Sequence, residues 1–358
     1  MKLNYGIIGT GMMGCEHIRN LKKIPDVKIV AIADPNERSR KWAEDTCEDA
    51  FKLRLYEDYK ELLAQEDIDV VVIASPNFTH IEVMRELFKT DKHVLLEKPM
   101  CTNLSDGIEV LEKSKKHKGV VWIGLEYRFM SPIQSLINHV SEIGNIKMLS
   151  IREHRFPFLE KVDNWNRFNE KTGGTLVEKC CHFFDLMNLM MPSKPIKIYA
   201  SGGQDVNHLD ERYDGKVPDI IDNSFVLIDY EDGERAMLDL CMFAEAGKYE
   251  QEIVLTGDRG KLETHIPGNE VLLTNRQEYS HRTIEIKEDS RVKEVGFHHG
   301  ASYIEHLELI DCIKKGNQPL VDCQKGFDSI VLGLAAQESI KTGESINLND
   351  FLKNEYEI

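Results

Sequence analysis

The stretch GIIGTGMMG, residues 6–14, places Gly9, Gly11 and Gly14 directly after a short apolar run. A tight turn needs one glycine, so three at this spacing indicate that another group approaches the backbone closely. In the dinucleotide-binding fingerprint, the first glycine allows the turn, the second admits a pyrophosphate and the third lets helix and strand pack together. A helix expected to begin near Met12 would offer free N–H groups to that anion. The sequence therefore predicts a dinucleotide site, and the alternative is a simple glycine-rich turn.

A carboxylate follows the second apolar run, VKIVAIAD, at Asp34, twenty residues after Gly14. A carboxylate in this position hydrogen-bonds the adenosine ribose of NAD and repels the 2′-phosphate of NADP. Arg38, four residues later, is able to accommodate that phosphate. We therefore predict NAD as the cofactor, with NADP as the open alternative.

The pattern of apolar residues differs between the two halves of the chain. Up to residue 125, short β-branched runs such as IDVVVIAS alternate with amphipathic segments, and the runs have no polar face. Strands of this kind are buried on both sides, as in a parallel sheet covered by helices. From about residue 145 the runs are longer, partly alternating and joined by hairpin signals such as the Asp-Gly of YEDGER. We predict an α/β chain with an N-terminal Rossmann doubly wound domain over residues 1–126. A C-terminal α+β domain with a large, mostly antiparallel open sheet is predicted over residues 127–358.

Charge and hydropathy exclude two classes of partner. The 358 residues carry a formal net charge of −16, whereas a nucleic-acid surface needs clustered Lys and Arg, so we expect no nucleic-acid partner. No apolar run approaches the roughly 18 residues needed to cross a bilayer, so we expect no membrane span. The start of the chain reads directly into a strand, which predicts no signal peptide.

The eight cysteines are scattered and show no CxxC spacing. Without secretion they are expected to be reduced thiols, which predicts a cytoplasmic location. Cys180, Cys181 and His182 are consecutive, so they cannot converge on one ion from a helix. We therefore predict no metal site.

A lysine ends the predicted strand in HVLLEKP, in the order Glu97-Lys98-Pro99. In open α/β sheets the ligand lies beyond the carboxyl ends of the strands, so Lys98 is expected to point toward it. Pro99 restricts Lys98 to an extended backbone. The alternative is a solvated lysine at the end of a strand.

A second polar constellation lies in TGGTLVEKCCHFFDLMNLMMP, residues 172–192, where two glycines open a predicted helix. Glu178 and His182 are four residues apart and share one helical face. A carboxylate beside an imidazole orients the ring and favours its charged form, which suits general acid–base catalysis. The alternatives are a capping box of Thr175 with Glu178, and a histidine that merely packs in the core.

The stretch ASPNFTH, residues 74–80, ends another buried run. Thr79 and Glu82 fit a capping box, so a helix is expected to start here and face the cofactor. Asn77 and His80 are candidates to line the cofactor cleft. For His80 the alternative is a structural role in the first helical turn.

Together these features resemble the Gfo/Idh/MocA family of sugar and inositol oxidoreductases. The resemblance runs along nearly the whole chain, through GIIGTGMMG, AIADPNERSR, ASPNFTH, EKP, EYRF, TGGTLVEKCCHFFDL and GESINL. It implies that Lys98 is the active-site lysine and His182 the acid–base histidine. Glu178 stands where the family usually has Asp, and Glu126 stands where many members have Asn, near the nicotinamide.

The resemblance also implies a C-terminal domain whose open sheet often serves in oligomerisation. Because an uncovered sheet face is unfavourable in water, a homo-oligomer, a dimer or tetramer, is expected. The predicted cofactor-binding residues are Gly9, Gly11, Met12, Met13, Gly14, Asp34, Arg38, Ser75, Asn77, His80, Glu97, Lys98 and Glu126. Candidates for the substrate pocket, chosen as polar or aromatic residues in loop-like stretches, are Arg128, Arg155, Trp165, Asn166 and His299.

The predicted function is that of an NAD-dependent dehydrogenase oxidising a secondary hydroxyl of a sugar, glycoside or cyclitol by hydride transfer to nicotinamide. Lys98 and His182 are expected to take or relay the hydroxyl proton, and Glu178 to orient His182 or hold a neighbouring hydroxyl. One alternative is an NAD-dependent glycosidase that uses transient oxidation and elimination. The other is a non-catalytic NAD-binding sensor, which would have no use for Lys98 and His182.

Overall fold

The computed structural model describes residues 2–47 and 53–356 of the chain. The chain divides into two compact units. The first unit comprises Met1–Met130 and Asp289–Phe327, and the second comprises Ser131–Glu288 and Asp328–Ile358. The sequence prediction places one boundary after residue 126, whereas in the structure the chain also returns to the first unit at residue 289.

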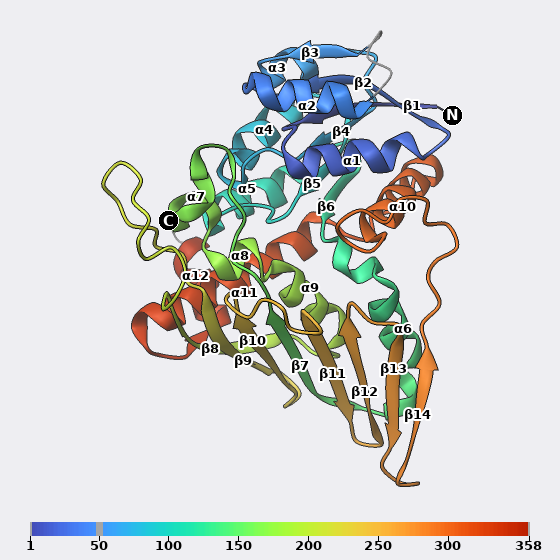
Figure 1. Cartoon of the computed structure of the whole chain (residues 1–358), viewed down its shortest axis with the longest axis vertical. Coiled ribbons are helices and arrows are strands. Elements are labelled where there is room, and N and C mark those ends of the chain that lie inside the picture. Colours follow the sequence, from blue (N-terminus) through green and yellow to red (C-terminus); the bar gives the residue numbers. More distant parts are fainter. Residues whose placement is uncertain (1, 48–52, 357–358) are drawn as a thin grey trace. The chain divides into compact units, whose positions relative to one another are not determined.

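A six-stranded parallel sheet forms the first unit, in the order β3-β2-β1-β4-β5-β6 (Figure 1). Every residue of β4 and β6 is buried, which explains why these apolar runs have no polar face. The strand order reverses between β1 and β4, the point at which doubly wound sheets bind their ligands. The predicted Rossmann domain is confirmed. Its strands are β1 Leu3–Ile8, β2 Val27–Ala33, β3 Arg54–Tyr56, β4 Val70–Ile73, β5 His93–Glu97 and β6 Val121–Gly124.

Helices connect these strands and extend the unit. They are α1 Met12–Lys22, α2 Glu37–Cys47, α3 Tyr59–Leu63, η2 Asn77–Thr79, α4 His80–Leu87, α5 Leu104–Ser114, η3 Glu126–Phe129 and α10 Ala301–Lys315. α10 comes from the returning segment and packs on α1 and η3. It buries Glu305 and His306, two polar residues that face the unit's interior.

The second unit contains a nine-stranded sheet in the order β14-β13-β12-β11-β7-β10-β9-β8-β15 (Figure 1). β7 and β10 pair in parallel and the other neighbours are antiparallel, so the predicted mostly antiparallel sheet is confirmed. Its strands are β7 Ile146–His154, β8 Pro195–Gly203, β9 Asn223–Tyr230, β10 Arg235–Cys241, β11 Gln251–Gly257, β12 Gly260–Ile266, β13 Glu270–Asn275, β14 Ser280–Glu285 and β15 Ile346–Asn347.

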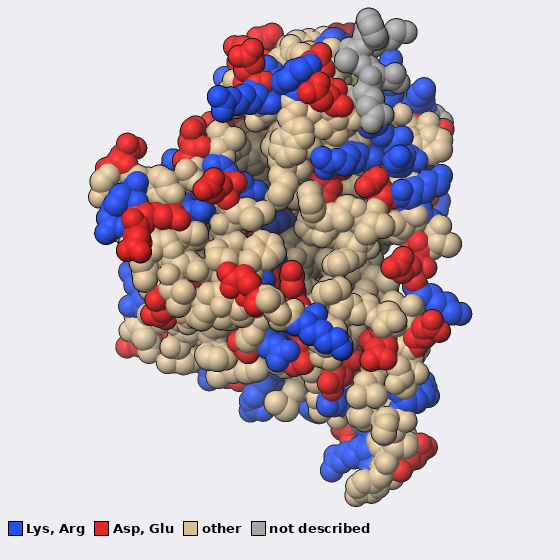
Figure 2. Space-filling model, viewed as in Figure 1, with Lys and Arg blue, Asp and Glu red and all other residues tan. Residues whose placement is uncertain are grey.

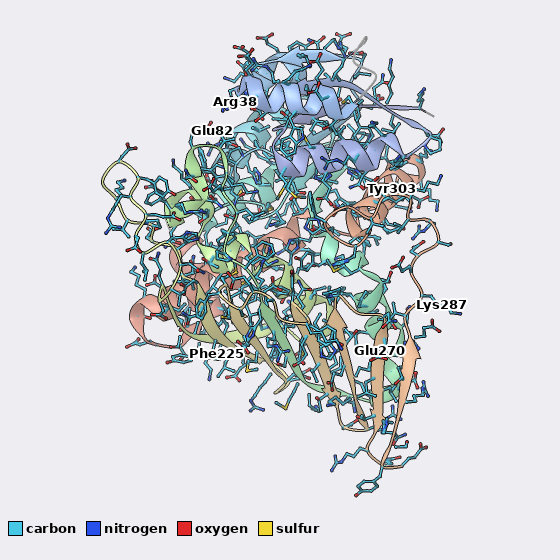
Figure 3. The ribbon with its side chains drawn as sticks, viewed as in Figure 1. Arg38, Glu82, Phe225, Glu270, Lys287 and Tyr303 are labelled. Carbon is cyan, nitrogen blue, oxygen red and sulfur yellow. The ribbon has the colours of Figure 1, made fainter. Side chains whose placement is uncertain are left out.

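One face of this sheet, here called the uncovered face, carries exposed apolar side chains in the part of the chain that the structure describes. Phe225, labelled in Figure 3, and Leu227 are 60% and 53% exposed on β9, and Tyr199 on β8 lies opposite Leu227 in register. Val226 and Ile228, which alternate with Phe225 and Leu227 along β9, are buried. The helices of the unit are α6 Ser131–His139, η4 Val140–Ile143, η5 Val162–Arg167, α7 Asn169–Thr172, α8 Thr175–Glu178, α9 Cys181–Met190 and α12 Leu348–Tyr356, and α11 Cys323–Thr342 runs into it from the first unit.

The surface carries both signs of charge. On the face shown in Figure 2, acidic and basic side chains are interspersed. Among the described residues, no helix combines the length and the apolar character that a bilayer crossing requires.

Candidate active site

The glycine loop joins β1 to α1. Gly9 has a φ of +83°, and a Cβ there would overlap the backbone of Ala74 and Ser75. A Cβ on Gly14 would overlap the carbonyl oxygen of Gly9. A Cβ on Gly11, by contrast, would meet no atom within 4 Å. The packing of the chain itself therefore requires Gly9 and Gly14, whereas the room beside Gly11 fits a bound pyrophosphate.

The first turn of α1 presents its N–H groups beside this room. Gly11 is the N-cap, and no side chain caps the helix. The N–H groups are thus available to an anion, and the helix dipole favours one there. Met12 and Met13, both half-buried, begin the helix. The residues present fit the diphosphate of a dinucleotide.

Asp34 follows β2 and is held against the glycine loop. Its Oδ2 accepts a hydrogen bond from the backbone nitrogen of Thr10 at 2.8 Å, and its Oδ1 accepts one from Asn36 at 2.8 Å. These bonds fix a carboxylate beside the loop, as hydrogen bonding to the adenosine ribose requires. Arg38, labelled in Figure 3, is exposed in the first turn of α2, so a 2′-phosphate would have access to it.

His80 connects the loop after β4 to the segment after β5. Its Nδ1 lies 2.9 Å from the carbonyl oxygen of Pro99, and its Nε2 lies 3.0 Å from that of Ser75. Burial lowers the pKa of His80 although both carbonyls oppose the shift. The predicted capping box at this helix is wrong, because the Thr79 hydroxyl donates to Ser75 and Pro76 and caps no helix. Asn77 is buried nearby in η2.

Lys98 follows β5 directly, and its backbone is held by Glu97. Oε2 of Glu97 accepts the Lys98 N–H at 3.1 Å, and Oε1 lies 2.8 Å from Nε2 of His17. Burial alone would raise the pKa of Glu97, but the hydrogen bond and charge of His17 and the charge of Lys98 lower it below its ordinary value. Glu97 is therefore an ionised carboxylate that fixes the backbone of Lys98. The Lys98–Pro99 peptide bond is cis.

Glu126 begins η3 and is 2% exposed. Burial, together with the nearby charge of Glu97, raises its pKa to about 7, although the charges of His298 and Lys98 oppose this shift. Nε2 of His298 lies 3.5 Å from Oε1 of Glu126. Arg128, two residues later, is buried and donates to the carbonyl of Leu320 at 3.4 Å.

In the second unit, two glycines precede the residues Glu178 and His182. Gly174 has a φ of +88°, and a side chain there would overlap Gln337, which donates to the carbonyl of Gly173. The single helix predicted over this stretch is wrong, because it is interrupted after α8 and resumes as α9. Both Glu178 and His182 are buried.

Thr175 and Glu178 do not form the capping box considered as an alternative. Gly174 is the N-cap of α8 without a side-chain cap, and the Thr175 hydroxyl donates to the carbonyl of Ile221 at 2.6 Å. The side chain of Lys179, the next residue, forms an ion pair with the buried Glu153, with Nζ 2.9 Å from Oε1.

The substrate candidates in the second unit are placed differently from one another. Arg155 lies 3.3 Å from the same Oε1 of Glu153, with its guanidinium 4.3 Å from the ring centre of Phe156. Asn166 is fully buried and donates to the carbonyl of Leu159 at 2.9 Å, so it holds its own loop. Trp165 is half-buried beside it.

His299, the candidate from the returning segment of the first unit, is exposed with a φ of +51°. It is His298, its neighbour, that faces the buried carboxylates Glu16 and Glu126.

Comparison with known proteins decides the family. A family model described as "Oxidoreductase family, C-terminal alpha/beta domain" matches residues 137–348, and "Oxidoreductase family, NAD-binding Rossmann fold" matches residues 3–125. The chain belongs to the Gfo/Idh/MocA family. It is an oxidoreductase with a Rossmann domain that binds NAD.

Several relatives of the family cover much of the chain. Myo-inositol 2-dehydrogenase of Thermotoga maritima is 28% identical over 360 residues, covering 98% of this chain and all of the relative. The uncharacterized oxidoreductase YrbE of Bacillus subtilis is 30% identical over 71% of both chains. The 2,7-anhydro-N-acetylneuraminate hydratase of Mediterraneibacter gnavus is 26% identical over 66% of this chain and 61% of its own.

Solved structures of the family share the fold. Levoglucosan dehydrogenase in complex with NADH and levoglucosan superposes with a TM-score of 0.85 at 18% identity, covering 97% of this chain and all of the other. An oxidoreductase from Agrobacterium radiobacter in complex with NAD⁺, L-tartaric acid and magnesium gives 0.81 at 17% identity, covering 98% and 100%.

Some buried residues of the first unit were not predicted from the sequence. Glu16 and His17 lie on the inner side of α1, and Glu305 and His306 lie on the inner side of α10. Their signal was weak, because a polar pair inside an amphipathic helix ordinarily faces solvent. His17 alone offered a hint, since it follows the third glycine by one helical turn on the face that packs on the sheet.

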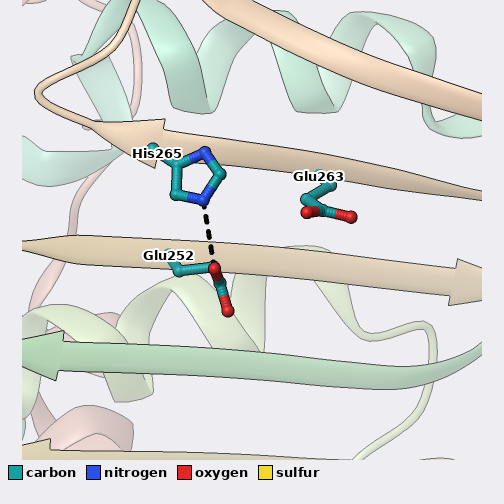
Figure 4. Close-up of side chains that lie close together, drawn as sticks. All are labelled: Glu252, Glu263 and His265. Carbon is teal, nitrogen blue, oxygen red and sulfur yellow. Dashed lines mark hydrogen bonds and ion pairs between the residues drawn. The ribbon is translucent and has the colours of Figure 1, made fainter. Parts of the chain in front are cut away.

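One group in the described residues approaches the spacing of metal ligands. Glu252, Glu263 and His265 lie on the uncovered face of the second unit's sheet, with ligand atoms within 4.8 Å of one another (Figure 4). Its carboxylates already have cationic partners, since Arg152 lies 3.3 Å from Glu252 and Lys261 lies 2.7 Å from Glu263. These ion pairs argue against a resident cation here, and the absence of a catalytic metal stays a prediction.

Proposed function

We propose that this oxidoreductase oxidises a secondary hydroxyl of a sugar, glycoside or cyclitol, with NAD as the hydride acceptor. The observation that carries the proposal is the fixed lysine at the ligand end of the parallel sheet. Glu97 holds the Lys98 backbone, and the glycine loop beside it has room for a diphosphate. The relatives that act on inositol support a polyhydroxylated substrate.

Bound NAD supplies the electrophilic carbon that accepts a hydride from the substrate's carbinol carbon. The chain's residues handle the proton. Lys98 and His182 take or relay the hydroxyl proton, which typically contributes about 10²–10⁴-fold to the rate. Glu178 orients His182 or holds a neighbouring hydroxyl. It is one methylene longer than the family's usual Asp, so it reaches a different hydroxyl or holds the ring at a different distance.

A second candidate function uses the same cofactor without net oxidation. The similarity to a hydratase of an anhydro sugar favours it, since the name describes addition of water rather than removal of hydrogen. An NAD-dependent glycosidase, working by transient oxidation and elimination, belongs to the same class. In both cases NAD would return to its starting state after each turnover.

The experiment that separates these functions is a panel of compounds with excess NAD. The panel contains myo-inositol, glucose, levoglucosan and p-nitrophenyl glycosides, followed by NADH absorbance and by nitrophenol release. Accumulating NADH is the expected result. Nitrophenol release without NADH would replace the dehydrogenase by the glycosidase, and neither signal, with NAD still bound, would favour a sensor.

We also propose a homo-oligomer in the cytoplasm. The exposed apolar side chains Met148, Tyr199, Phe225 and Leu227 of the second unit's sheet suit contact with a second copy of the chain. All eight cysteines are free thiols, which agrees with a reducing compartment. Light scattering of the purified protein tests the oligomer, with a dimer or tetramer as the expected mass.

A further inference from the structure

A cluster of buried titratable side chains fills the interior of the first unit beside Lys98. Its members, here called the first-unit cluster, are the carboxylates Glu16, Glu97, Glu126 and Glu305 and the imidazoles His17, His298 and His306. A core this rich in ionisable groups is costly unless the groups are paired. The pairs form two separate chains of contacts, whose most exposed members differ: the Glu97 side chain is 7% exposed and that of His298 is 19% exposed.

The first chain of contacts ends at two fully buried imidazoles. Glu97 contacts His17, and Nδ1 of His17 lies 2.9 Å from Nε2 of His306. Both histidines are completely buried. Burial and the neighbouring His17 lower the pKa of His306 far below its ordinary value, so it stays neutral. These contacts hold the Glu97 carboxylate in place.

The second chain of contacts reaches the surface. Nε2 of His298 faces Glu126 at 3.5 Å, and Nδ1 faces Oε1 of Glu16 at 3.2 Å. The side chains of Glu16 and Glu126 are 1% and 2% exposed, whereas that of His298 is 19% exposed. His298 is therefore the member of this chain through which a proton can pass between Glu126 and water.

Glu16 holds His298 in this position. Its Oε1 also accepts the backbone N–H of Phe297 at 3.1 Å, and the Ser302 hydroxyl lies 3.4 Å away. Gly296 has a φ of +56°, and a side chain there would meet the same carboxylate oxygen. The segment before α10 is thus anchored on α1 through one carboxylate, and this fixes the ring of His298 toward Glu126.

The pKa of each partner is shifted upward by its surroundings. Burial raises the pKa of Glu126 to about 7, helped by Glu97 and opposed by His298 and Lys98. Burial would lower the pKa of His298, but the charges of Glu126, Glu16 and Glu97 and the hydrogen bond to Glu16 raise it above its ordinary value. Glu305, another ionisable neighbour, is kept protonated because burial raises its pKa far above the ordinary value.

We infer that Glu126 and His298 carry the proton released by substrate oxidation from Lys98 to solvent. The inference rests on the proposed function, in which Lys98 takes that proton. In that reaction a hydride would pass from the carbinol carbon to NAD, and the hydroxyl proton would pass to an unprotonated Nζ of Lys98. The resulting ammonium gives its proton to the Glu126 carboxylate, Glu126 gives it to Nε2 of His298, and His298 releases it to water. Each group then returns to its starting state.

The first test measures the coupling of the two groups without any substrate. Selective ¹⁵N-histidine NMR of the full chain follows the titration of His298 in the wild type and in Glu126→Gln. The inference expects a lower pKa of His298 in the variant, because the charge of Glu126 has been removed. An unchanged titration would overturn the inference, whatever the enzyme's substrate is.

The second test measures turnover with the compound of the panel that forms NADH fastest. Glu126→Gln and His298→Gln should each lower kcat at neutral pH roughly tenfold or more, and should abolish its rise with an apparent pKa near 7. The double variant should be no slower than either single variant, because both interrupt one route. Added imidazole buffer should restore part of the rate, which a structural defect would not allow.

Matched variants on β14 control for the loss of a Glu or a His. Glu285→Gln and His281→Gln change exposed residues and should keep the wild-type kcat and pH profile. If His298→Gln also keeps them, or if imidazole restores nothing, the inference is wrong. If the wild type forms no NADH with any compound, the proposed function fails instead, and the NMR titration still decides the coupling.

Discussion

Replacing Gly11 by Ala should separate cofactor binding from stability. Gly11 has an extended backbone with a φ of −70°, which alanine adopts without strain, and the added Cβ meets no atom within 4 Å. The free energy of unfolding should therefore stay the same or rise by up to about 1 kcal/mol, since alanine restricts the unfolded chain. The methyl group would, however, stand where the diphosphate approaches the backbone.

The expected loss of NAD affinity follows from that position. If the methyl group removes one hydrogen bond from a backbone N–H to the charged diphosphate, about 1.5–3 kcal/mol is lost. This corresponds to at least a tenfold weaker Kd. Gly14→Ala should behave in the opposite way, because its Cβ overlaps the Gly9 carbonyl and the crowding costs typically about 1–3 kcal/mol of stability.

Two assays on each variant test this separation. Urea unfolding gives the free energy of unfolding, and quenching of protein fluorescence gives the Kd for NADH. Gly247→Ala is the matched control, since Gly247 is exposed and its Cβ would make only ordinary contacts. A Gly11→Ala protein that binds NADH as tightly as the wild type would refute the assignment of the loop. A Gly11→Ala protein as unstable as Gly14→Ala would also refute this assignment.

Three further changes test other parts of the account. Asp34→Ser removes the carboxylate beside the glycine loop. It should lower the ratio of kcat/KM for NAD to kcat/KM for NADP by tenfold or more. An unchanged ratio would mean that Asp34 does not select the cofactor. Glu126→Gln should raise the free energy of unfolding above pH 7 by at most about 3 kcal/mol and leave it unchanged below pH 4. A buried carboxyl whose pKa rises from 4.5 to about 7 costs stability as it ionises, so equal stability curves from pH 4 to 8 would count against the shift. Phe225→Glu places a charge on the uncovered sheet face and should lower the mass measured by light scattering. An unaltered mass would mean that the interface lies elsewhere.

The fold of the chain was largely predictable because its strongest signals are local. The glycine loop needs its residues at fixed spacing, and Gly9 and Gly14 have the positive φ or close backbone contact that the spacing implied. The strands of the first unit were readable because burial on both faces leaves them uniformly apolar. The strands of the second unit were readable because burial on one face alone produces an alternation of apolar and polar residues.

The return of residues 289–327 to the first unit was not predictable, because it depends on where α10 packs. The apolar pattern of a helix shows which side is buried and not which element covers it. The predicted capping box at Thr79 and the alternative one at Thr175 are both absent from the structure. The Thr79 hydroxyl bonds instead to Ser75 and Pro76 in the preceding turn, and the Thr175 hydroxyl bonds to Ile221, which lies 46 residues away and outside any local pattern.

The chemistry of the candidate site was predictable only in part. Lys98 stood out because it ends a buried strand, but its support by Glu97, His17 and His306 joins residues up to 289 positions apart. The placement of His298 toward Glu16 and Glu126 likewise depends on the fold of the returning segment. Long-range pairs of this kind leave no periodicity in the sequence.

The central claim is that Lys98 and His182 act on the proton of one oxidised hydroxyl. It is tested most directly by kcat for NADH formation in Lys98→Met, His182→Gln and the double variant, on the fastest compound of the panel. The account predicts that each single change lowers kcat by about 10²–10⁴-fold. It also predicts that the Kd for NADH stays within about twofold and that the double variant falls by much less than the product. A Lys98→Met protein that keeps the wild-type kcat would contradict the account.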